Sequence, residues 1–441
     1  MAPGQVRTHG RARHGAHRRR WRQSTAALGL TTLCILAVAV VPAVAVVPAV
    51  APAAAGQQPD GFAQAVAVSG DTLVVGSAYA DTRRAVDAGS VLVYQRTGTA
   101  WVQQAELTAP DGRTYDGFGV SVAVRGDIVV VGAPSAAAPG GSHAGAAYVY
   151  SRSGSLWRLK AKLSASEGQD WDAFGSSVAL DGSSVVVGAP ETPTARDDRV
   201  GAAYVFARSG AGWTEQGTLL PPDGDRNDLF GTSVALDGDT AVVGSPYHDN
   251  RDPKGTGAAY VFRRAEGSWT GAAKLYPDNF FDAYFGFSVA VDGSVVAVGV
   301  PEAQNEVFWA GAVHMFTFSG GRLVRQSVLL ASEPSLYARF GTSVALSDDT
   351  LVIGAPGADT PAAEDSGAAY AFQRSGSSWT EQARLPVPDA VPGAGIGIAV
   401  GLNGTTAVVG APGLDPLVGS VQVFVRSGTT WMRQAEIVPP E

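Results

Sequence analysis

Cysteine is almost absent from this sequence of 441 residues. The one cysteine, Cys34, lies within an apolar stretch near the start of the chain. The rest of the chain therefore has no disulfide and no thiolate that acts as a nucleophile or a metal ligand. Leu33 precedes Cys34 at a place where a lipoprotein attachment site needs a small residue, so lipid attachment at Cys34 is not expected.

Histidine is also scarce, and only His143, His248 and His314 follow residue 55. No Ser-His-Asp arrangement and no HExxH motif can be assembled from them in sequence order. Acidic pairs such as Asp197-Asp198 are typical of solvated loops, although a glycosidase also uses two carboxyl groups at a defined separation. The sequence therefore predicts no catalytic residues, no cofactor and a protein that is not an enzyme.

Acidic residues are missing from residues 1–55, which carry seven arginines and then an apolar run from Ala26 to Val50. This layout, followed by Ala53-Ala54-Ala55, is typical of a secretory signal peptide cleaved near Ala55. An uncleaved anchor is the alternative, because the run is long enough to span a bilayer, although three prolines in and after it argue against one continuous helix. We expect a secreted, extracellular protein, or a cell-surface display scaffold anchored through residues 26–50.

Basic residues are few once that segment is set aside. The remaining chain has 25 Lys and Arg against 40 Asp and Glu, a net charge of −15. A nucleic-acid partner needs a basic surface, so this composition argues against one. After cleavage we expect no contact with the membrane, and we expect a monomer.

The sequence is rich in one repeated unit, exemplified by Phe118–Pro134 (FGVSVAVRGDIVVVGAP). Phe-Gly opens the unit, a short polar turn divides it, and Gly-Ala-Pro closes it. Seven copies follow one another at steps of 55 or 56 residues, and they begin at Phe62, Phe118, Phe174, Phe230, Phe285, Phe340 and Ile396. A spacing this regular indicates a repeat architecture.

Each copy is predicted to form four strands. In the copy Phe174–Leu220, FGSSVAL alternates with period two, Asp181-Gly182 is a tight turn, and SSVVVGAP is a β-branched run. GAAYVFARSG and GWTEQGTLL are the third and fourth strands. One such sheet cannot bury both of its apolar faces alone, whereas seven sheets around an axis can; stacked β-sandwich modules would need about 100 residues each.

The sequence therefore predicts an all-β fold over residues 56–441. The fold is a seven-bladed β-propeller of four-stranded antiparallel blades, each built from contiguous chain. Gly in the closing triplet lets a neighbouring backbone come close or supplies a special φ, and Pro ends the strand. Six copies have a tryptophan in the fourth strand: Trp101, Trp157, Trp213, Trp269, Trp379 and Trp431. We expect these rings to pack between blades; a ring of sugar-stacking platforms is the other interpretation.

The copies FGVSVAVRGDIVVVGAP, FGSSVALDGSSVVVGAP and FGTSVALSDDTLVIGAP closely resemble FG-GAP repeats. Such repeats build the seven-bladed propeller at the N-terminus of integrin α subunits, and they occur in many secreted bacterial proteins. The resemblance covers the chain from Phe62 to its end. It implies that the ligand face is the one that bears the connections between second and third strands. It implies no particular ligand, because the motif consists of scaffold residues.

Integrin-type copies often carry a calcium loop between their first two strands. Calcium needs six to eight oxygen ligands, and the corresponding turns here are too short and have too few carboxylates. We predict no calcium at these turns and no other metal site. The turn Arg125-Gly126-Asp127 spells an adhesion tripeptide, but every copy has a polar turn there, so we interpret it as a turn; an adhesion ligand is the alternative.

One neighbourhood departs from the repeat pattern and is the candidate binding site. Loops of blades four and five, and the connection between these blades, combine aromatic with acidic residues, as binding patches do. The predicted residues are Tyr247, Asp249, Asp252, Phe280, Phe281, Asp282, Tyr284, Phe308 and Trp309, with Asp278 beside them. We predict an extracellular protein partner. The alternative is a carbohydrate-binding protein or a glycan-active enzyme that uses the same loops.

These aromatic residues also have a structural interpretation, as an alternative to a binding site. Blade five has Leu323 where other copies have a tryptophan. Trp309 or one of the phenylalanines would then fold inward to fill the gap between blades, and the aromatic residues would belong to the core.

Overall fold

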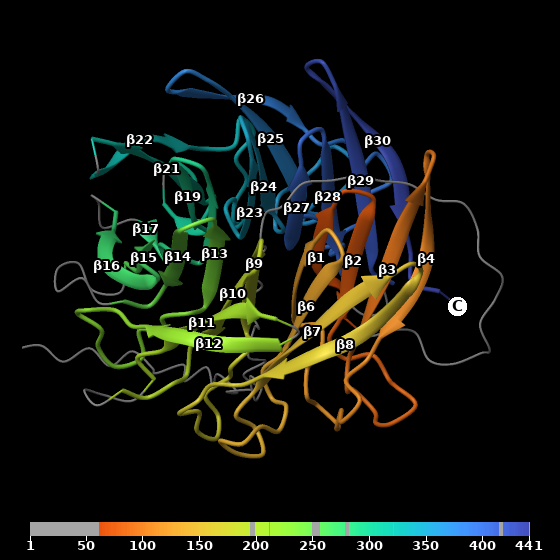
Figure 1. Cartoon of the computed structure of the whole chain (residues 1–441). Helices are drawn as coiled ribbons and strands as arrows, with labels where there is room; N and C mark the ends of the chain where they lie inside the picture. Colours follow the sequence, from red (N-terminus) through yellow and green to blue (C-terminus); the bar gives the residue numbers. More distant parts are fainter. Residues whose placement is uncertain are drawn as a thin grey trace, which may run out of the picture. The chain divides into compact units, whose positions relative to one another are not determined.

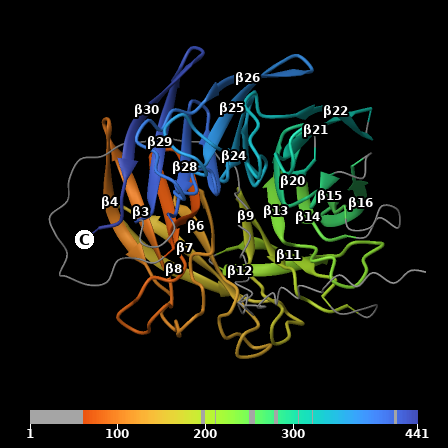
Figure 2. The same ribbon diagram turned by 180° about the vertical axis from the view of Figure 1, so that it is seen from behind.

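The computed structural model describes residues 61–194, 199–210, 212–248, 256–277, 282–304, 306–320, 322–413 and 418–440. In these ranges the chain folds into seven four-stranded antiparallel sheets set around an axis (Figure 1). Figure 2 shows the same ring of blades from behind. The predicted seven-bladed β-propeller is therefore confirmed. The segment predicted as a signal, residues 1–55, lies outside the described residues, and the described part of the chain forms no apolar helix long enough to cross a membrane.

Every blade uses four strands that are consecutive in the chain. The first strands neighbour one another around the ring: β1 (Phe62–Ser69), β5 (Ser121–Arg125), β9 (Ser177–Asp181), β13 (Ser233–Asp237), β18 (Ser288–Asp292), β23 (Ser343–Ser347) and β27 (Ala399–Asn403). The second strands are β2 (Thr72–Ser77), β6 (Ile128–Ala133), β10 (Ser184–Ala189), β14 (Thr240–Ser245), β19 (Val295–Val300), β24 (Thr350–Ala355) and β28 (Thr406–Ala411).

The third strands are β3 (Ser90–Thr97), β7 (Ala146–Ser153), β11 (Ala202–Ser209), β15 (Ala258–Ala265), β21 (Ala312–Ser319), β25 (Ala368–Ser375) and β29 (Ser420–Ser427). The fourth strands form the outer edges: β4 (Ala100–Leu107), β8 (Leu156–Leu163), β12 (Gly212–Leu219), β16 (Ser268–Leu275), β22 (Arg322–Leu329), β26 (Ser378–Arg384) and β30 (Thr430–Ile437). In blade five a short ribbon is added, in which β17 (Asp282–Ala283) pairs with β20 (Glu302–Ala303).

The ring closes by packing of β1 against β27 and β28. Among the described strands none is exchanged between the first and the last blade, so the prediction of contiguous blades is confirmed.

The inner strands are buried on both faces because each blade packs between two others. β10, with the sequence SVVVGA, is buried along its whole length. β9 is buried at four consecutive positions, so the alternating burial expected of FGSSVAL is wrong. β9 begins only at Ser177, three residues after Phe174. The reason is that Gly175 has a φ of 99°, which is not an extended strand conformation. Alternating exposure appears instead in the outer strand β12.

Aromatic side chains fill the space between blades. Phe230 packs against Tyr260 at a centroid distance of 5.5 Å and against Phe262 at 6.0 Å. Trp101 is fully buried in a cluster that joins blades one and seven. Trp157 packs on the cluster of blades one and two, and its Nε1 donates to Oε1 of Gln104 at 2.8 Å. The fourth-strand tryptophans described here therefore pack between blades, as predicted.

The Phe-Gly and Gly-Ala-Pro motifs meet at the joint between two blades. At the joint of blades two and three, Gly175 N donates to the Gly188 oxygen of its own blade at 2.9 Å. The carbonyl oxygen of Gly175 accepts a hydrogen bond from Ser121 Oγ of the preceding blade at 2.8 Å. This oxygen lies so close to Gly132 that a Cβ on Gly132 would overlap it. The closing glycine is therefore needed for close approach of two backbones.

The serine bond recurs at four further joints: Ser177–Gly231, Ser233–Gly286, Ser288–Gly341 and Ser343–Gly397. Blades one and seven carry Ala65 and Ala399 at the equivalent places. An alanine has no hydroxyl, so the two joints on either side of blade one lack this bond.

A β-bulge interrupts the outer pair of strands in all seven blades, at the same register in six of them and one residue further along the third strand in blade four. In blade three, Val205 pairs with Gly217 and Phe206 pairs with Glu215, so Gln216 is left out of the ladder. A bulge of this kind bends the strand and increases its twist.

Candidate functional site

Connections of two kinds lie side by side on the predicted ligand face. In blade five, the connection after β20 meets the connection that leads from β22 into blade six. Tyr337 N donates to the Phe308 oxygen at 3.2 Å, and Arg339 N donates to the Trp309 oxygen at 3.2 Å. The loop after the second strand of blade five is thus held against the entrance to blade six.

The structure describes four of the predicted site residues in full: Tyr247, Tyr284, Phe308 and Trp309. Of Asp282 it describes the backbone, which pairs with Ala303 in the β17–β20 ribbon. The other predicted residues, Asp249, Asp252, Phe280 and Phe281, lie outside the described residues, as does Asp278.

The four described residues form two aromatic groups. Tyr247 and Tyr284 meet edge to face with ring centroids 5.0 Å apart. Phe308 stacks on Trp309 at 4.9 Å, and Tyr337 packs edge-on against both rings, at 5.8 Å and 5.4 Å. Phe308 is 44% exposed and Tyr337 46% exposed, so the second group offers aromatic surface to solvent.

An ion pair lies with these two groups. Glu302 and Arg339 approach within 3.5 Å. Burial raises the pKa of Glu302, and the positive charge of Arg339 only partly opposes this. Burial also raises the pKa of Tyr247 and Tyr284, and the negative charge of Glu302 raises both further. The charge of Glu302 therefore acts on the tyrosine pair, while the backbone of Arg339 is hydrogen-bonded to that of Trp309. We call Tyr247, Tyr284, Glu302, Phe308, Trp309, Tyr337 and Arg339 the aromatic patch.

Several residues of the aromatic patch have a strained backbone. The φ angles are 64° for Tyr284, 52° for Trp309, 59° for Tyr337 and 56° for Arg339. A left-handed conformation costs a non-glycine residue roughly 1–2 kcal/mol. Equivalent residues in other copies, such as Asn227 and Leu229, have the same conformation, so it belongs to the repeated connection between blades.

The gap expected at Leu323 is filled locally. Leu323 pairs with Phe318, and both pack against the hydrophobic cluster of blades four and five. In the other blades the same pairing joins an arginine to a tryptophan, as in Arg264 and Trp269. Arg263 of blade four lies over the Phe318 ring at 4.3 Å. The aromatic rings of the patch are thus not needed to fill this space.

A buried polar network next to Tyr247 was not predicted. His248 is 2% exposed, and its Nδ1 lies 2.6 Å from Asp228 Oδ2 while its Nε2 lies 2.7 Å from Lys274 Nζ. Lys274 also binds Asp223 at 2.8 Å, and Asp223 accepts from Tyr260 Oη at 2.7 Å. A lysine always donates, so Nε2 is the acceptor and Nδ1 carries the proton toward Asp228. Both ring nitrogens are engaged, and the network fixes the start of the loop that carries Tyr247.

The sequence held one signal for this network. The position four residues after the closing glycine is alanine in blades one, two, five and six, and His248 occupies it in blade four. A polar side chain at a buried position needs a partner. Which partner it finds depends on Asp228 and Lys274, whose approach only the fold defines.

Several turns between first and second strands are hydrogen-bonded to the turn of the neighbouring blade. Gly238 N donates to Asp181 at 2.8 Å, and Gly293 N donates to Asp237 at 2.7 Å. In the exposed Arg-Gly-Asp turn, Arg125 pairs with Asp181 at 2.8 Å and Asp127 pairs with Arg152 at 2.7 Å. The described residues include no group of three or more His, Cys, Asp or Glu placed to hold a metal ion.

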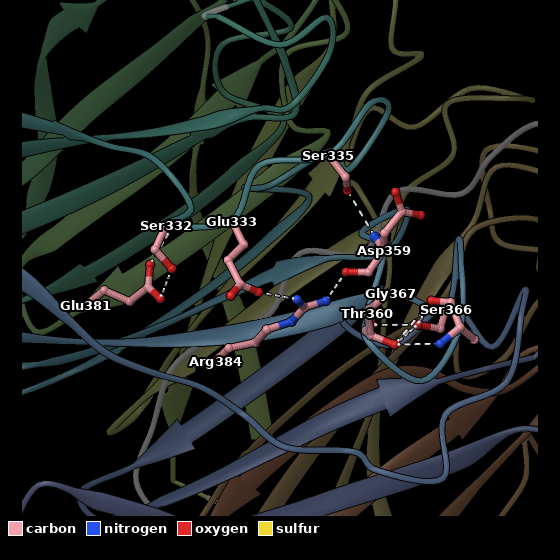
Figure 3. A network of polar contacts seen from close by, with 10 residues as sticks. Ser332, Glu333, Ser335, Asp359, Thr360, Ser366, Gly367, Glu381 and Arg384 are labelled. Atoms are coloured by element: carbon pink, nitrogen blue, oxygen red, sulfur yellow. Dashed lines mark hydrogen bonds and ion pairs between the residues drawn. The ribbon is translucent and has the colours of Figure 1, made fainter.

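A second network fixes the connection that carries Tyr337 (Figure 3). Glu333 pairs with Arg384 of β26 at 2.8 Å, and Arg384 also donates to the Asp359 oxygen. Ser335 Oγ accepts from Asp359 N at 2.9 Å, and Ser332 Oγ donates to Glu381 at 2.6 Å. Tyr337 is therefore presented by a connection that is bonded to blade six.

Two hollows lie elsewhere on the molecule. One of about 440 Å³ is lined by Thr360, Arg384 and Pro386, and one of about 250 Å³ is lined by Asp389, Gln422 and Glu436. Both belong to the region of blades six and seven, and neither includes a residue of the aromatic patch.

Comparison with known proteins gives a family and a fold. Six segments match the family model described as FG-GAP repeat: residues 52–94, 101–150, 157–206, 213–262, 323–372 and 379–424. The unmatched stretch 263–322 contains Tyr284, Glu302, Phe308 and Trp309. The part of the chain that departs from the family pattern is thus the part that carries most of the aromatic patch.

Human integrin alpha-7 is 30% identical to this chain over 176 residues, which cover 38% of this chain and 14% of integrin alpha-7. The crystal structure of Sqt1 from Chaetomium thermophilum has a TM-score of 0.50 and 16% identity, covering 85% of this chain and 84% of that chain. Sqt1 from Saccharomyces cerevisiae has a TM-score of 0.43 and 10% identity, covering 87% of this chain and 97% of that chain. At such identity the similarity to the Chaetomium structure shows the fold alone.

Proposed function

The chain belongs to the FG-GAP repeat family, and from this premise we propose that it is a secreted, non-enzymatic propeller that binds an extracellular protein through the aromatic patch. The observation that carries the proposal is the group Phe308, Trp309 and Tyr337. Its rings pack on one another, and two of them are about half exposed. Exposed aromatic side chains held in place are the usual anchors of protein interfaces.

The chemistry of the aromatic patch favours a protein over a small molecule. The aromatic patch presents rings at several angles, so it offers no single flat face to a small ring ligand, and Leu336 lies beside the rings at 52% exposure. Glu302 and Arg339 add a charged pair among the rings. An aromatic centre with polar neighbours is the arrangement of a protein-binding surface.

The rigid setting supports the same conclusion. Tyr337 and Arg339 are bonded to the loop of Phe308 and Trp309, and their connection is tied to Arg384. A surface that is ordered before binding loses less conformational entropy when a partner docks. Secretion rests on the arginine-rich and apolar layout of residues 1–55. A non-enzymatic role rests on the sequence, in which no Ser-His-Asp arrangement and no HExxH motif can be assembled from the three histidines after residue 55.

The test uses the full chain and two variants of the aromatic patch. Proteins that the chain captures from the medium and surface extracts of the producing cells are identified, and the affinity of the captured protein is measured by biolayer interferometry. We expect Tyr337→Ser and Phe308→Ser each to weaken binding at least about tenfold, as loss of an interface anchor does. Tyr115→Ser is the matched control, because Tyr115 is 66% exposed at the equivalent place in blade two, with a φ of 66°.

Two results would contradict the proposal. One is a partner whose affinity is unchanged in both variants while their melting temperatures are unchanged. The other is binding in a glycan array that Trp309→Ala abolishes without a change in melting temperature. That second result would favour the alternative, a carbohydrate-binding protein that uses the loops of blades four and five.

A further inference from the structure

A second aromatic surface lies on blades two and three, apart from the aromatic patch. Trp171, on the connection from β8 to β9, is 62% exposed. It stacks face to face on His143, with ring centroids 4.2 Å apart and an interplanar angle of 6°. His143 comes from the connection between β6 and β7. The imidazole thus covers one face of the indole, and the exposure of Trp171 leaves a flat aromatic face toward solvent.

The exposed tryptophan is not required by the fold. Residues three before the opening Phe or Ile of a copy share a left-handed backbone: Tyr115, Trp171, Asn227, Tyr337 and Gly393. Glycine and asparagine suit this conformation, whereas a bulky residue there is a genuine outlier. Blade three nevertheless places a tryptophan, Trp171, at a φ of 72° and leaves most of its side chain in water. The left-handed backbone belongs to the repeated connection, so the stacking of Trp171 on His143 is what sets this tryptophan apart from the exposed Tyr115 of blade two.

The surroundings hold Trp171 and His143 in a fixed arrangement. Trp171 N donates to the His143 oxygen at 3.1 Å, and His143 N donates to Asp170 Oδ1 at 2.7 Å. Gly141 lies so close to Asp170 that a Cβ on it would come within 2.6 Å of Asp170 Oδ1. The two connections are therefore closely packed, and the stacked pair is formed before any ligand arrives.

Polar groups lie next to the stacked pair, in contact with His143. Ser142 Oγ lies 3.0 Å from His143 Nδ1. The side chain of Asp170 is 44% exposed. A hydroxyl and a carboxylate next to an aromatic face provide hydrogen-bond partners for a ligand that has an apolar face and polar edges. The aromatic patch differs, because its rings lie at several angles to one another.

We propose that Trp171 and His143 form a binding site for a neutral pyranose sugar. One face of a pyranose ring presents C–H groups, which are attracted to the negative face of an indole. Its equatorial hydroxyls extend sideways and can reach polar groups next to the stacked pair, of which Asp170 and Ser142 contact His143. An anionic sugar does not fit, because Asp170 contributes negative charge here and the chain after residue 55 carries a net charge of −15. This site is independent of the proposed protein interface.

The test is saturation-transfer NMR on the full chain with three probes: methyl β-D-glucopyranoside, methyl β-D-galactopyranoside and methyl α-D-mannopyranoside. We expect at least one probe to bind with a Kd in the millimolar range, as suits a ligand of about a dozen heavy atoms. Its C–H protons on one ring face should receive the strongest transfer. Trp171→Gly should weaken this binding at least tenfold, and Trp171→Phe should retain part of it.

Controls separate loss of the site from loss of the fold. Trp171→Gly should leave the melting temperature unchanged or raised, since glycine occupies the same place at Gly393 in blade seven. Tyr115→Ala should leave sugar binding unchanged. The proposal is overturned if none of the three sugars binds, or if Trp171→Gly leaves the Kd of the bound sugar unchanged. It is also overturned if Trp171→Gly weakens binding of the protein partner while no sugar binds, because Trp171 would then belong to the protein interface.

Discussion

Gly132 meets the carbonyl oxygen of Gly175 across the joint between blades two and three, and no side chain fits between them. The same relationship joins Gly188 to Gly231 and Gly354 to Gly397. The repeated Phe-Gly and Gly-Ala-Pro motifs are thus the two halves of one contact between successive blades.

Gly132→Ala should therefore destabilise the propeller strongly. The added methyl group must displace the backbone of blade three, and we expect a cost at the upper end of the range of about 1–3 kcal/mol that is typical of overpacking. Gly154→Ala is the control, because Gly154 has a φ of 63° but open space around it, so only conformational strain of about 1 kcal/mol is expected. Denaturant unfolding of both variants measures the difference. Equal losses would show that close approach is not the reason for the glycine.

Ala65→Ser and Ala399→Ser should each stabilise the fold. They restore the hydroxyl that Ser121 and Ser177 use to bind the carbonyl oxygen of the next blade. A buried hydrogen bond of this kind contributes about 1 kcal/mol. Ser177→Ala should lower the stability by a similar amount. Thermal melts of the three variants show whether each melting temperature rises or falls as expected. A serine at residue 65 or 399 that lowers the melting temperature would mean that these joints have a different geometry.

Asp223→Asn should lower stability near neutral pH. Burial raises the pKa of Asp223, but hydrogen bonds from Lys274 and Tyr260 outweigh this effect and bring the pKa below its usual value. A carboxyl group whose pKa is lowered by folding adds stability above its unfolded pKa, and this stability is lost as the pH falls through the folded pKa. The melting temperatures of variant and wild type should thus converge below a pH of about 4.

The control for this pH dependence is Asp239→Asn, which removes an exposed carboxylate that pairs with Arg264. Its effect should be small, as for most surface ion pairs. A difference between Asp223→Asn and wild type that stays constant from neutral to acidic pH would argue against a role for the ionised carboxylate.

Trp309→Ala should leave the melting temperature nearly unchanged, whereas Trp101→Ala should cost about 3–5 kcal/mol. Trp309 lies in a surface loop against Phe308 and Tyr337, while Trp101 is fully buried between blades one and seven. Denaturant unfolding monitored by circular dichroism compares the two. A large loss in Trp309→Ala would instead assign Trp309 to the core and remove it from the candidate site.

Calcium should not shift the melting temperature. In the turns where integrin-type repeats carry calcium loops, Asp181 and Asp237 already accept hydrogen bonds from the neighbouring turns. Scanning calorimetry with calcium chloride and with a chelator measures this directly. A rise of several degrees with calcium would reveal a cation site formed by other residues.

The fold was predictable because its determinants recur. Phe174 and Gly188 occupy the same places in successive copies, so one interpretation of the pattern applied to the whole ring. The alternating burial expected for β9 was wrong for a physical reason. Alternation with period two is typical of a sheet with one face exposed to solvent, whereas an inner strand of a propeller is covered on both faces.

The candidate site was predictable only in part. Tyr284, Phe308 and Trp309 stood out because they break the repeat pattern. Tyr337 was missed because it lies one connection further along, in a copy that looks regular. An aromatic residue three positions before the opening Phe also occurs at Tyr115 and Trp171, and this recurrence was the available signal. The pairing of His248 with Asp228 depends on side-chain approach, which spacing does not encode.

The bulge in every outer strand has a consequence for the protein in concentrated solution. A propeller of this kind has seven outer edges, and a flat, regular edge would be a template for pairing with another molecule. Each ladder here is broken near its middle, as at Gln216 in blade three. Two such edges cannot align over their full length, so we expect the blades to resist sheet-to-sheet aggregation even where many copies of the chain are crowded together.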